Sequence, residues 1–176
     1  SSENWSRPKE EVDGLMKLYL EYLKSAENET SDKNVRVRII GSREGLSREI
    51  VDQINKIETA TKNKTRMTLN IALNYGGRQD LLQAVRKIVD DVQNGLLDKD
   101  KITCEELQKR LYTEDIPDPD LLIRTSGEMR ISNFLIWQCS YTEFYFSPVL
   151  WPDFREKHLH EAIIEYQRRN RRFGGV

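Results

Sequence analysis

The chain has 176 residues, and its 28 lysines and arginines nearly balance its 29 aspartates and glutamates, which leaves a formal charge of −1. This balance argues against a general nucleic-acid-binding protein, because such proteins normally carry a basic excess. No apolar run approaches the roughly 18 residues of a membrane-spanning helix, and the polar, acidic start does not resemble a signal peptide. The two cysteines, Cys104 and Cys139, lie far apart without a C-x-x-C pattern, so they indicate neither a metal nor a redox site. We therefore expect one cytoplasmic domain.

The first half of the chain alternates between patterns typical of helices and of strands. Pro8 fits the first turn of a helix, and apolar residues follow it at helical spacing, at Val12, Leu15, Met16, Tyr19, Leu20 and Leu23. The polar segment 27–34 is expected to be a loop. Apolar and polar residues alternate along 35–39 and 67–73, which predicts two strands. Between them, Ser47 is expected to cap a second helix.

The second half of the chain continues this alternation. Apolar spacing predicts a helix over 81–92 that Asn94-Gly95 closes, and Thr103-x-x-Glu106 is a capping-box pattern for a short helix through Leu111. The remaining expected elements are, in order, a buried strand at 121–124, a helical turn around 134–138, a short strand at 144–146, and a last helix capped by Asp153-x-x-Glu156. The pattern predicts an α/β fold: a single domain with a mainly parallel central sheet flanked by helices.

Two polar segments directly follow predicted strands. They are 74–78, N-Y-G-G-R, and 124–127, R-T-S-G. In parallel sheets ligands bind beyond the carboxyl ends of the strands. We therefore expect both segments at the ligand-binding edge of the sheet.

The segment 118–154 is the most informative part of the sequence. It sets Arg124, Arg130, Ser132 and Glu143 around an apolar run. The planar fork of donors on arginine suits phosphate oxygens, and a hydroxyl adds a further donor. A carboxylate beside bound phosphates suits Mg²⁺, which prefers oxygen ligands. The sequence predicts that the two arginines and Ser132 converge on a phosphorylated ligand.

Three blocks of the chain resemble the cis-prenyltransferases, the undecaprenyl diphosphate synthase family, in the family's own order. The chain opens with S-S-E-N-W-S-R-P, which is similar to the family's S-x-E-N-W-x-R-P. Residues 70–78 read N-I-A-L-N-Y-G-G-R. The segment 118–154 resembles the C-terminal signature of the family and completes the match.

The resemblance implies a role for each matching residue. Asn4 is placed to assist loss of a proton from C2 of the substrate. Because an amide is a weak base, Asn4 would orient or relay this proton, and a diphosphate oxygen would accept it. Glu143 would help to coordinate Mg²⁺. The resemblance further implies that substrates are bound by Ser1, Ser2, Glu3, Trp5, Arg7, Arg124, Arg130, Ile131 and Ser132. Of these, Arg124, Arg130 and Ser132 would hold the diphosphate of isopentenyl diphosphate.

The implied reaction adds isopentenyl diphosphate units to an allylic diphosphate, with farnesyl diphosphate expected, to form a long-chain Z-polyprenyl diphosphate. Undecaprenyl diphosphate is the expected product. The family also implies a homodimer, a tunnel lined by sheet residues such as Met67, Leu69, Ile71 and Leu73, and a peripheral contact with the membrane for product release. A competing interpretation is a non-catalytic partner subunit of a heteromeric prenyltransferase. Such partners typically lose the diphosphate-binding residues, whereas this chain retains Arg124, Arg130, Ser132 and Glu143.

The chain departs from the family pattern at one point. Family members carry a D-G-N-G-R-W segment that supplies the principal Mg²⁺ ligand and cradles the allylic diphosphate, and these 176 residues contain no such segment. We therefore interpret residues 1–176 as the C-terminal portion of a single cis-prenyltransferase domain. We expect this portion alone to bind metal weakly and to be inactive.

Two basic positions leave alternatives open. Arg78 follows two glycines at an expected helix N-terminus, which is a ready anion site, but it can equally be a structural arginine that closes the sheet edge. Arg172-Phe173-Gly174 resembles a family segment that reaches the substrate of a neighbouring subunit. Arg172 also belongs to a basic run with Arg168, Arg169 and Arg171. Such a run suits the C-terminus of a helix, where cations complement the helix dipole.

Overall fold

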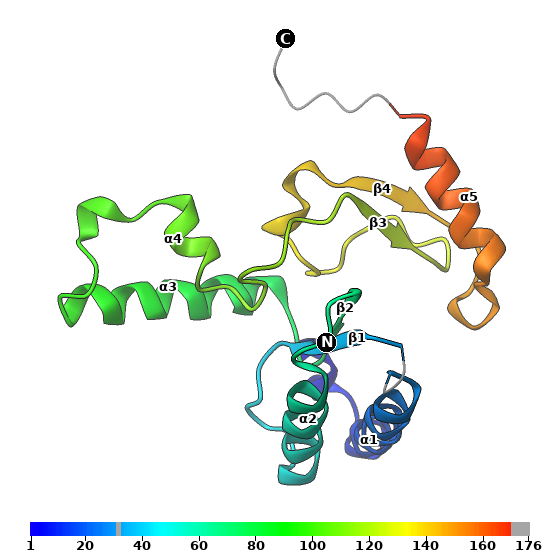
Figure 1. Cartoon of the computed structure of the whole chain (residues 1–176), viewed down its shortest axis with the longest axis horizontal. Helices are drawn as coiled ribbons and strands as arrows, with labels where there is room; N and C mark the ends of the chain where they lie inside the picture. Colours follow the sequence, from blue (N-terminus) through cyan, green and yellow to red (C-terminus); the bar gives the residue numbers. More distant parts are fainter. Residues whose placement is uncertain (31–32, 170–176) are drawn as a thin grey trace.

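The computed structural model describes residues 1–30 and 33–169, in which helices and parallel strands alternate along the chain (Figure 1). The predicted α/β class is confirmed. In chain order the elements are η1 (Ser2–Ser6), α1 (Lys9–Thr30), β1 (Val35–Ile40), α2 (Arg48–Thr61), β2 (Met67–Ala72), α3 (Gly77–Gln93), η2 (Lys99–Lys101), α4 (Cys104–Gln108), β3 (Leu121–Arg124), η3 (Gln138–Tyr141), β4 (Glu143–Phe146), η4 (Trp151–Asp153) and α5 (Glu156–Gln167).

The strands pair in parallel, each with its neighbour in the sequence. β1 pairs with β2 in a register that runs from Val35 opposite Met67 to Ile40 opposite Ala72. β3 pairs with β4 from Leu121 opposite Glu143 to Arg124 opposite Phe146. Within the described residues these are two separate two-stranded sheets, whereas the sequence pattern predicts one central sheet. The carboxyl ends of β2 and β3 are followed by the two polar segments expected at a ligand-binding edge.

The main core lies between the β1–β2 pair and two helices that cover one of its faces. Ile54 and Ile57 of α2 are fully buried, and they pack with Val37 of β1 and Leu23 of α1. The alternation along β1 directs Val35, Val37 and Ile39 to this face, because successive strand side chains point to opposite sides. The helices α1 and α2 lie together below β1 and β2 in Figure 1.

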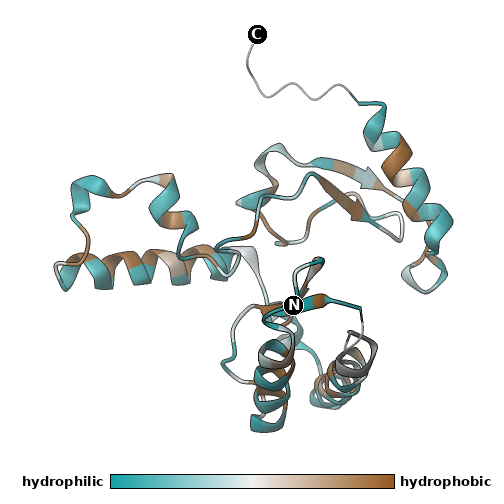
Figure 2. Cartoon of the chain, viewed as in Figure 1, coloured by the Kyte–Doolittle hydropathy of each residue, from teal (hydrophilic) through white to brown (hydrophobic). Residues whose placement is uncertain are grey.

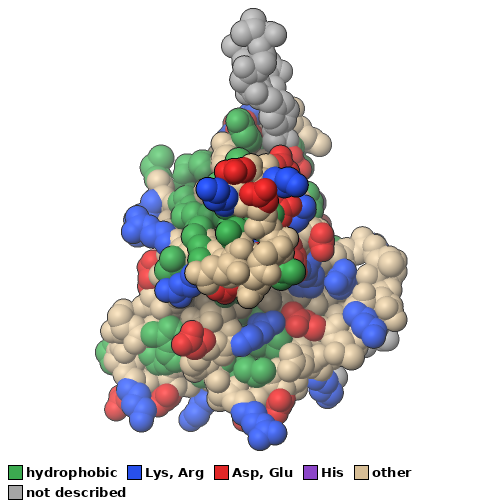
Figure 3. Space-filling view, turned by 90° about the vertical axis from the view of Figure 1, so that its left-hand side faces the viewer, with side chains coloured by type: hydrophobic (Ala, Val, Ile, Leu, Met, Phe, Trp, Pro, Cys, Tyr) green, Lys and Arg blue, Asp and Glu red, His purple; other side chains and the backbone are tan. Residues whose placement is uncertain are grey.

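The α3–α4 end of the molecule leaves an apolar face open. Figure 2 shows apolar and polar residues alternating along α3. Leu82, Val85 and Val89 of this helix are about half exposed. A space-filling view of this end shows hydrophobic side chains lying among charged ones (Figure 3). Among the described helices, none is both long and apolar enough to cross a bilayer.

Several element boundaries differ from the sequence prediction. Helix α1 continues to Thr30, so the loop predicted from residue 27 is wrong over its first four positions. The short helix α4 ends at Gln108, before the predicted Leu111. Residues 134–137 form turns instead of a helix, and a 3₁₀ turn follows at Gln138–Tyr141.

The predicted helix caps are partly correct. The hydroxyls of Ser47 and Thr103 accept hydrogen bonds from Ile50 N–H and Glu106 N–H, as expected. Asp153 was expected to cap the last helix, and this prediction is wrong. Its own N–H donates to the Leu150 carbonyl in a 3₁₀ turn, so the helix starts two residues later.

Truncating the core should destabilise the protein strongly. We expect Ile54→Ala to lower the free energy of unfolding by about 2–5 kcal/mol, because it removes buried methyl groups and leaves a cavity. The matched control is Ile102→Ala, since Ile102 is 45% exposed, and its effect should stay below about 1 kcal/mol. Urea unfolding of the two variants measures this difference, and equal effects would contradict the assignment of the core.

Candidate functional site

A cavity of about 390 Å³ lies where the carboxyl ends of β2 and β3 meet the N-terminal segment. Its walls include Asn4 and Arg7 from the N-terminal segment, Arg124 from the end of β3, and Ile131 and Ser132 from the loop that follows. These five positions are among the predicted site residues. The fold therefore brings the N-terminal block and the C-terminal block of the sequence to one hollow.

Arg124 is the main positive charge of this cavity. It is half-buried, and no carboxylate in the described part of the chain pairs with its guanidinium. Its backbone is fixed, because its carbonyl accepts a 2.7 Å hydrogen bond from Ser147 N–H. Arg7 also lines the cavity, but it forms a 2.5 Å ion pair with Glu11 on α1. A half-buried guanidinium without a carboxylate favours binding of an anion.

The N-terminal segment is held in place by contacts with residues far along the chain. Ser2 N–H donates to the Tyr75 carbonyl at 3.0 Å. The indole N–H of Trp5 donates to Asn74 Oδ1 at 2.7 Å. Asn133 Nδ2 donates to Glu3 Oε1 at 3.3 Å. These contacts place Ser1, Glu3 and Asn4 along the wall of the cavity.

Asn133 joins the loop after β3 to the start of α3. Its side-chain oxygen accepts from Arg78 N–H at 2.9 Å, and its carbonyl accepts from Gly77 N–H at 2.7 Å. The first two amides of α3 are therefore already satisfied. The Arg78 side chain is exposed, and both alternatives for it stay predictions.

The loop after β3 has an unusual backbone. Ser132, Asn133 and Leu135 all have positive φ angles, of 46°, 61° and 46°. Residues other than glycine rarely adopt positive φ angles, and such backbone strain is concentrated at functional sites. The conformation turns Ser132 into the cavity wall and Asn133 toward α3.

Tyr75 forms a buried part of the cavity wall. It is 4% exposed, and its ring meets Phe134 edge-on with ring centres 5.8 Å apart. Its hydroxyl donates to Asp80 Oδ2 at 3.1 Å. Burial, followed by the negative charge of Asp80, raises the pKa of Tyr75 well above its usual range. Tyr75 is therefore a neutral donor in this structure.

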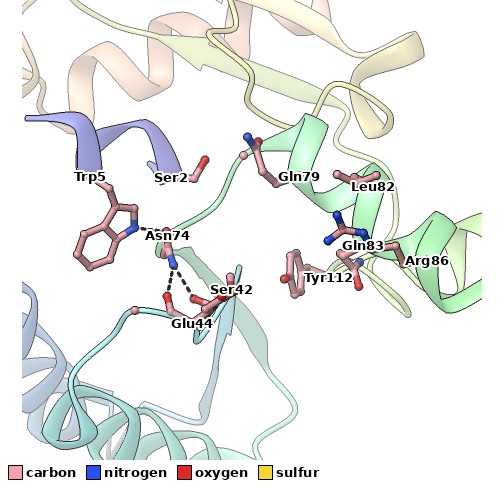
Figure 4. Close-up of a pocket in the computed structure, with 12 residues that line it drawn as sticks. Ser2, Trp5, Ser42, Glu44, Asn74, Gln79, Leu82, Gln83, Arg86 and Tyr112 are labelled. Atoms are coloured by element: carbon pink, nitrogen blue, oxygen red, sulfur yellow. Dashed lines mark hydrogen bonds between the residues drawn. The ribbon is translucent and has the colours of Figure 1, made fainter.

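Four predicted site residues do not line this cavity. Arg130 is exposed and forms an ion pair with Glu128. The expectation that both arginines converge with Ser132 is therefore met by Arg124 alone. Ser2 and Trp5 line a neighbouring cavity (Figure 4). Glu143, at the start of β4, forms a 2.8 Å ion pair with Arg169.

The described residues do not form a metal site by themselves. They contain no cluster of three or more histidine, cysteine, aspartate or glutamate side chains suited to a metal ion. Glu143 offers a single carboxylate, and Arg169 neutralises it. A Mg²⁺ at this position would have to compete with that guanidinium and take its remaining ligands from elsewhere. The segment Arg172-Phe173-Gly174 lies outside the described residues.

Comparisons with known proteins show the family of the chain. Residues 1–174 match the family model described as "Putative undecaprenyl diphosphate synthase". The chain belongs to this family. An isoprenyl transferase of Clostridium tetani is 49% identical over 176 residues, which cover 100% of this chain and 69% of that protein. A Pasteurella multocida protein named as an undecaprenyl-diphosphate synthase specific for farnesyl diphosphate is 50% identical, with 100% of this chain and 73% of that protein covered.

Solved structures of family members have the same fold. Lavandulyl diphosphate synthase from Lavandula x intermedia, in complex with dimethylallyl diphosphate, aligns with a TM-score of 0.94 at 38% identity and covers 99% of this chain and 75% of that chain. A probable undecaprenyl diphosphate synthase from Campylobacter jejuni aligns with a TM-score of 0.87 at 33% identity, and the alignment covers 99% of this chain and 79% of that chain. The predicted enzyme class, an isoprenyl transferase of the cis-prenyl diphosphate synthase family, is confirmed.

The sequence placed Asn74 and Tyr75 in the segment 74–78 expected at the ligand-binding edge but assigned neither residue a role, and Asn133 was missed. Their contribution comes from contacts between distant segments that no spacing rule predicts. One signal was present: asparagine is among the few residues other than glycine that are enriched at positive φ. Asn74 and Asn133 both have this conformation.

Removing the Tyr75 hydroxyl should weaken the fold in a pH-dependent way. The pKa of Tyr75 is raised in the folded state. The contribution of Tyr75 to the free energy of unfolding is therefore complete below its unfolded pKa of about 10, and this contribution is lost as the pH rises above that value. We expect Tyr75→Phe to cost about 1 kcal/mol of unfolding free energy near neutral pH, and this deficit should shrink above a pH of about 10.

Urea unfolding across this pH range measures the effect of Tyr75→Phe. Tyr22→Phe is the control, since Tyr22 is 66% exposed and its substitution should have little effect at any pH. A deficit for Tyr75→Phe that stays constant into the alkaline range would contradict the burial argument.

Proposed function

We propose that this protein joins isopentenyl diphosphate units to an allylic diphosphate, with farnesyl diphosphate as the preferred allylic substrate and undecaprenyl diphosphate as the product. The single observation that carries the proposal is the cavity in which Arg124, Ile131 and Ser132 lie opposite Asn4 and Arg7. The curated relatives named as isoprenyl transferases support the reaction class. The farnesyl-specific relative from Pasteurella multocida supports the allylic substrate and the product.

Arg124 and Ser132 are the proposed anchors for the diphosphate of isopentenyl diphosphate. Arginine can give two parallel hydrogen bonds to adjacent phosphate oxygens, and a hydroxyl gives a third. Arg124 has no carboxylate partner among the described residues, so binding does not first have to break an ion pair. Arg130 is the weaker contributor in this proposal, because Glu128 competes for it.

The proposed chemistry forms a carbon–carbon bond as a carbon–oxygen bond breaks. The diphosphate group leaves the allylic substrate with the electron pair of the broken carbon–oxygen bond, the allylic carbon bonds to the terminal alkene carbon of isopentenyl diphosphate, and a proton is lost from C2. Asn4, on the cavity wall, would orient that proton toward a diphosphate oxygen, since an amide is too weak a base to keep it. Tyr75 and Phe134 give one side of the cavity an aromatic wall that shields the reacting carbons from water.

A strip of apolar surface on β2 is the proposed path for the growing chain. Leu69 pairs with Val37 and shares its face of the sheet, yet Val37 is buried under the helices while Leu69 is 39% exposed. Met67, at the start of the same strand, is 53% exposed. Covering each five-carbon unit there would stabilise the bound chain by about 4 kcal/mol, at about 0.8 kcal/mol per carbon.

We also propose Mg²⁺ as the cofactor and a homodimer as the working form. When bound, the metal would stabilise the charge of the departing diphosphate, and Glu143 is the described residue that would contribute to holding it. The half-exposed apolar residues Leu82, Val85 and Val89 of α3 support a surface for a second copy. An apolar product favours work at a bilayer surface, so we propose a cytoplasmic protein in peripheral contact with a membrane.

Replacing Arg124 tests the proposed binding site. In the protein expressed from its complete reading frame, Arg124→Ala should raise the KM for isopentenyl diphosphate by about 10- to 100-fold, since a hydrogen bond to a charged group contributes about 1.5–3 kcal/mol. The KM for farnesyl diphosphate should change little. Arg124→Lys should raise the KM less than Arg124→Ala does, because lysine keeps the positive charge but lacks the planar guanidinium that gives two parallel hydrogen bonds.

Two comparisons make the test decisive. Arg130→Ala should have a smaller effect than Arg124→Ala, and Arg48→Ala should have none, since the Arg48 side chain is 95% exposed on α2. An unchanged KM in Arg124→Ala would overturn the assignment of the diphosphate site. Absence of prenyl transfer by the unmodified protein would favour a non-catalytic partner subunit instead.

A further inference from the structure

A second cavity, of about 420 Å³, lies beside the first, and Asn74 stands between the segments that form it (Figure 4). Its walls come from the N-terminal segment, from the loop between β1 and α2, and from α3. Trp5 projects into this region from the N-terminal side, with Glu44 and Gly45 across from it. A Cβ on Gly45 would lie 3.6 Å from the Trp5 ring, so the loop packs closely on the indole.

Asn74 uses its whole side-chain amide to join these segments. Its Oδ1 accepts from the indole N–H of Trp5 at 2.7 Å. Its Nδ2 donates to the carbonyls of Ser42 and Glu44, at 3.1 Å and 2.9 Å. Its own carbonyl accepts from Ser42 N–H at 3.2 Å. Few side chains can serve as acceptor and double donor in this way.

The position selects asparagine on two counts. Asn74 has φ of 50° and is 9% exposed. A left-handed backbone is accessible to glycine, asparagine and aspartate at low cost and is strained for most other residues. Glycine would fit the backbone without the hydrogen bonds, and aspartate would keep the acceptor but lose both donors.

The N-terminal segment needs such an anchor because it has little structure of its own. The 3₁₀ helix η1 is five residues long and contains no buried residue. Trp5 directly follows Asn4 and lies two positions before Arg7, and both of these line the substrate cavity. The position of Trp5 therefore sets how deeply Asn4 reaches into that cavity.

We propose that Asn74 is a positioning residue for the prenyl-transfer reaction, acting through the Trp5 indole N–H to hold Asn4 at the reacting carbons. This role rests on the proposed function. Asn74 lines the neighbouring cavity and is not among the residues that line the cavity of Asn4 and Arg124, so its role is assigned through Trp5. Its amide couples the loop after β1 and the turn after β2 to the segment that carries Asn4.

A double-substitution experiment on the protein from the complete reading frame tests this role. Asn74→Gly removes the three side-chain hydrogen bonds without straining the backbone, and Trp5→Phe keeps an aromatic ring but removes the N–H donor. Each should lower kcat by about tenfold or more, while the KM for isopentenyl diphosphate, set by Arg124, stays near its original value. The double variant should be no slower than the slower single variant, because both changes break the same contact between Trp5 and Asn74.

Two further variants separate positioning from folding. Asn74→Asp keeps the acceptor for Trp5 and should recover part of kcat. Asn94→Ala is the matched control, since Asn94 is an exposed asparagine at the end of α3, and its kcat should be unchanged. Multiplied losses in the double variant, or an Asn74→Gly protein with unchanged kcat, would overturn the proposal.

The contact itself can be read independently of catalysis. The chain has three tryptophans, and Trp5→Phe identifies the indole N–H resonance of Trp5 in a ¹⁵N spectrum. In Asn74→Gly this resonance should shift and exchange with solvent faster, and an unchanged resonance would contradict the contact. If the unmodified protein shows no prenyl transfer, the proposed function fails, while the spectrum still reports whether Asn74 holds Trp5.

Discussion

A half-buried positive charge without a carboxylate partner is the constraint on which the candidate site depends. Burying a guanidinium costs free energy unless an anion or several acceptors compensate it. Elsewhere in this chain that compensation is internal, as where Arg110 pairs with both Asp91 and Glu106. At Arg124 the described chain supplies no such carboxylate, so the fold keeps a favourable position for a phosphorylated ligand. The fixed strand end behind it, and the aromatic wall beside it, keep that position from relaxing.

Asparagine side chains assemble the rest of the site. Asn133 satisfies the first amides of α3 and contacts Glu3, while Asn74 ties Trp5 to the loop after β1. Both residues adopt positive φ, where a β-branched or bulky side chain would be strained. The site therefore consists of loops that have no packed core of their own. Their geometry comes from short polar contacts between segments that are far apart in the sequence.

Local sequence rules predicted most of the fold, because the elements concerned follow local physics. The alternation in 35–39 correctly placed a strand, since burial on one face imposes this period, and Ser47 correctly marked the start of a helix. The same rules did not pair the strands, because pairing is a long-range property. They also misplaced the start of α5, where a 3₁₀ turn at Trp151–Asp153 intervenes. At the site, residue type identified Arg124 and Ser132, but the pairing of Arg130 with Glu128 depends on a loop conformation that no pattern encodes.

The division of the strands into two separate pairs has a consequence for the edges of the sheets. In the described chain each sheet is only two strands wide, so every strand has one edge without a strand partner. Such edges present rows of N–H and C=O groups that can template intermolecular β-pairing. Two-stranded sheets also have little cooperative stability beyond what their covering helices give. The unpaired edges of these two sheets can therefore accept a further strand through backbone hydrogen bonds.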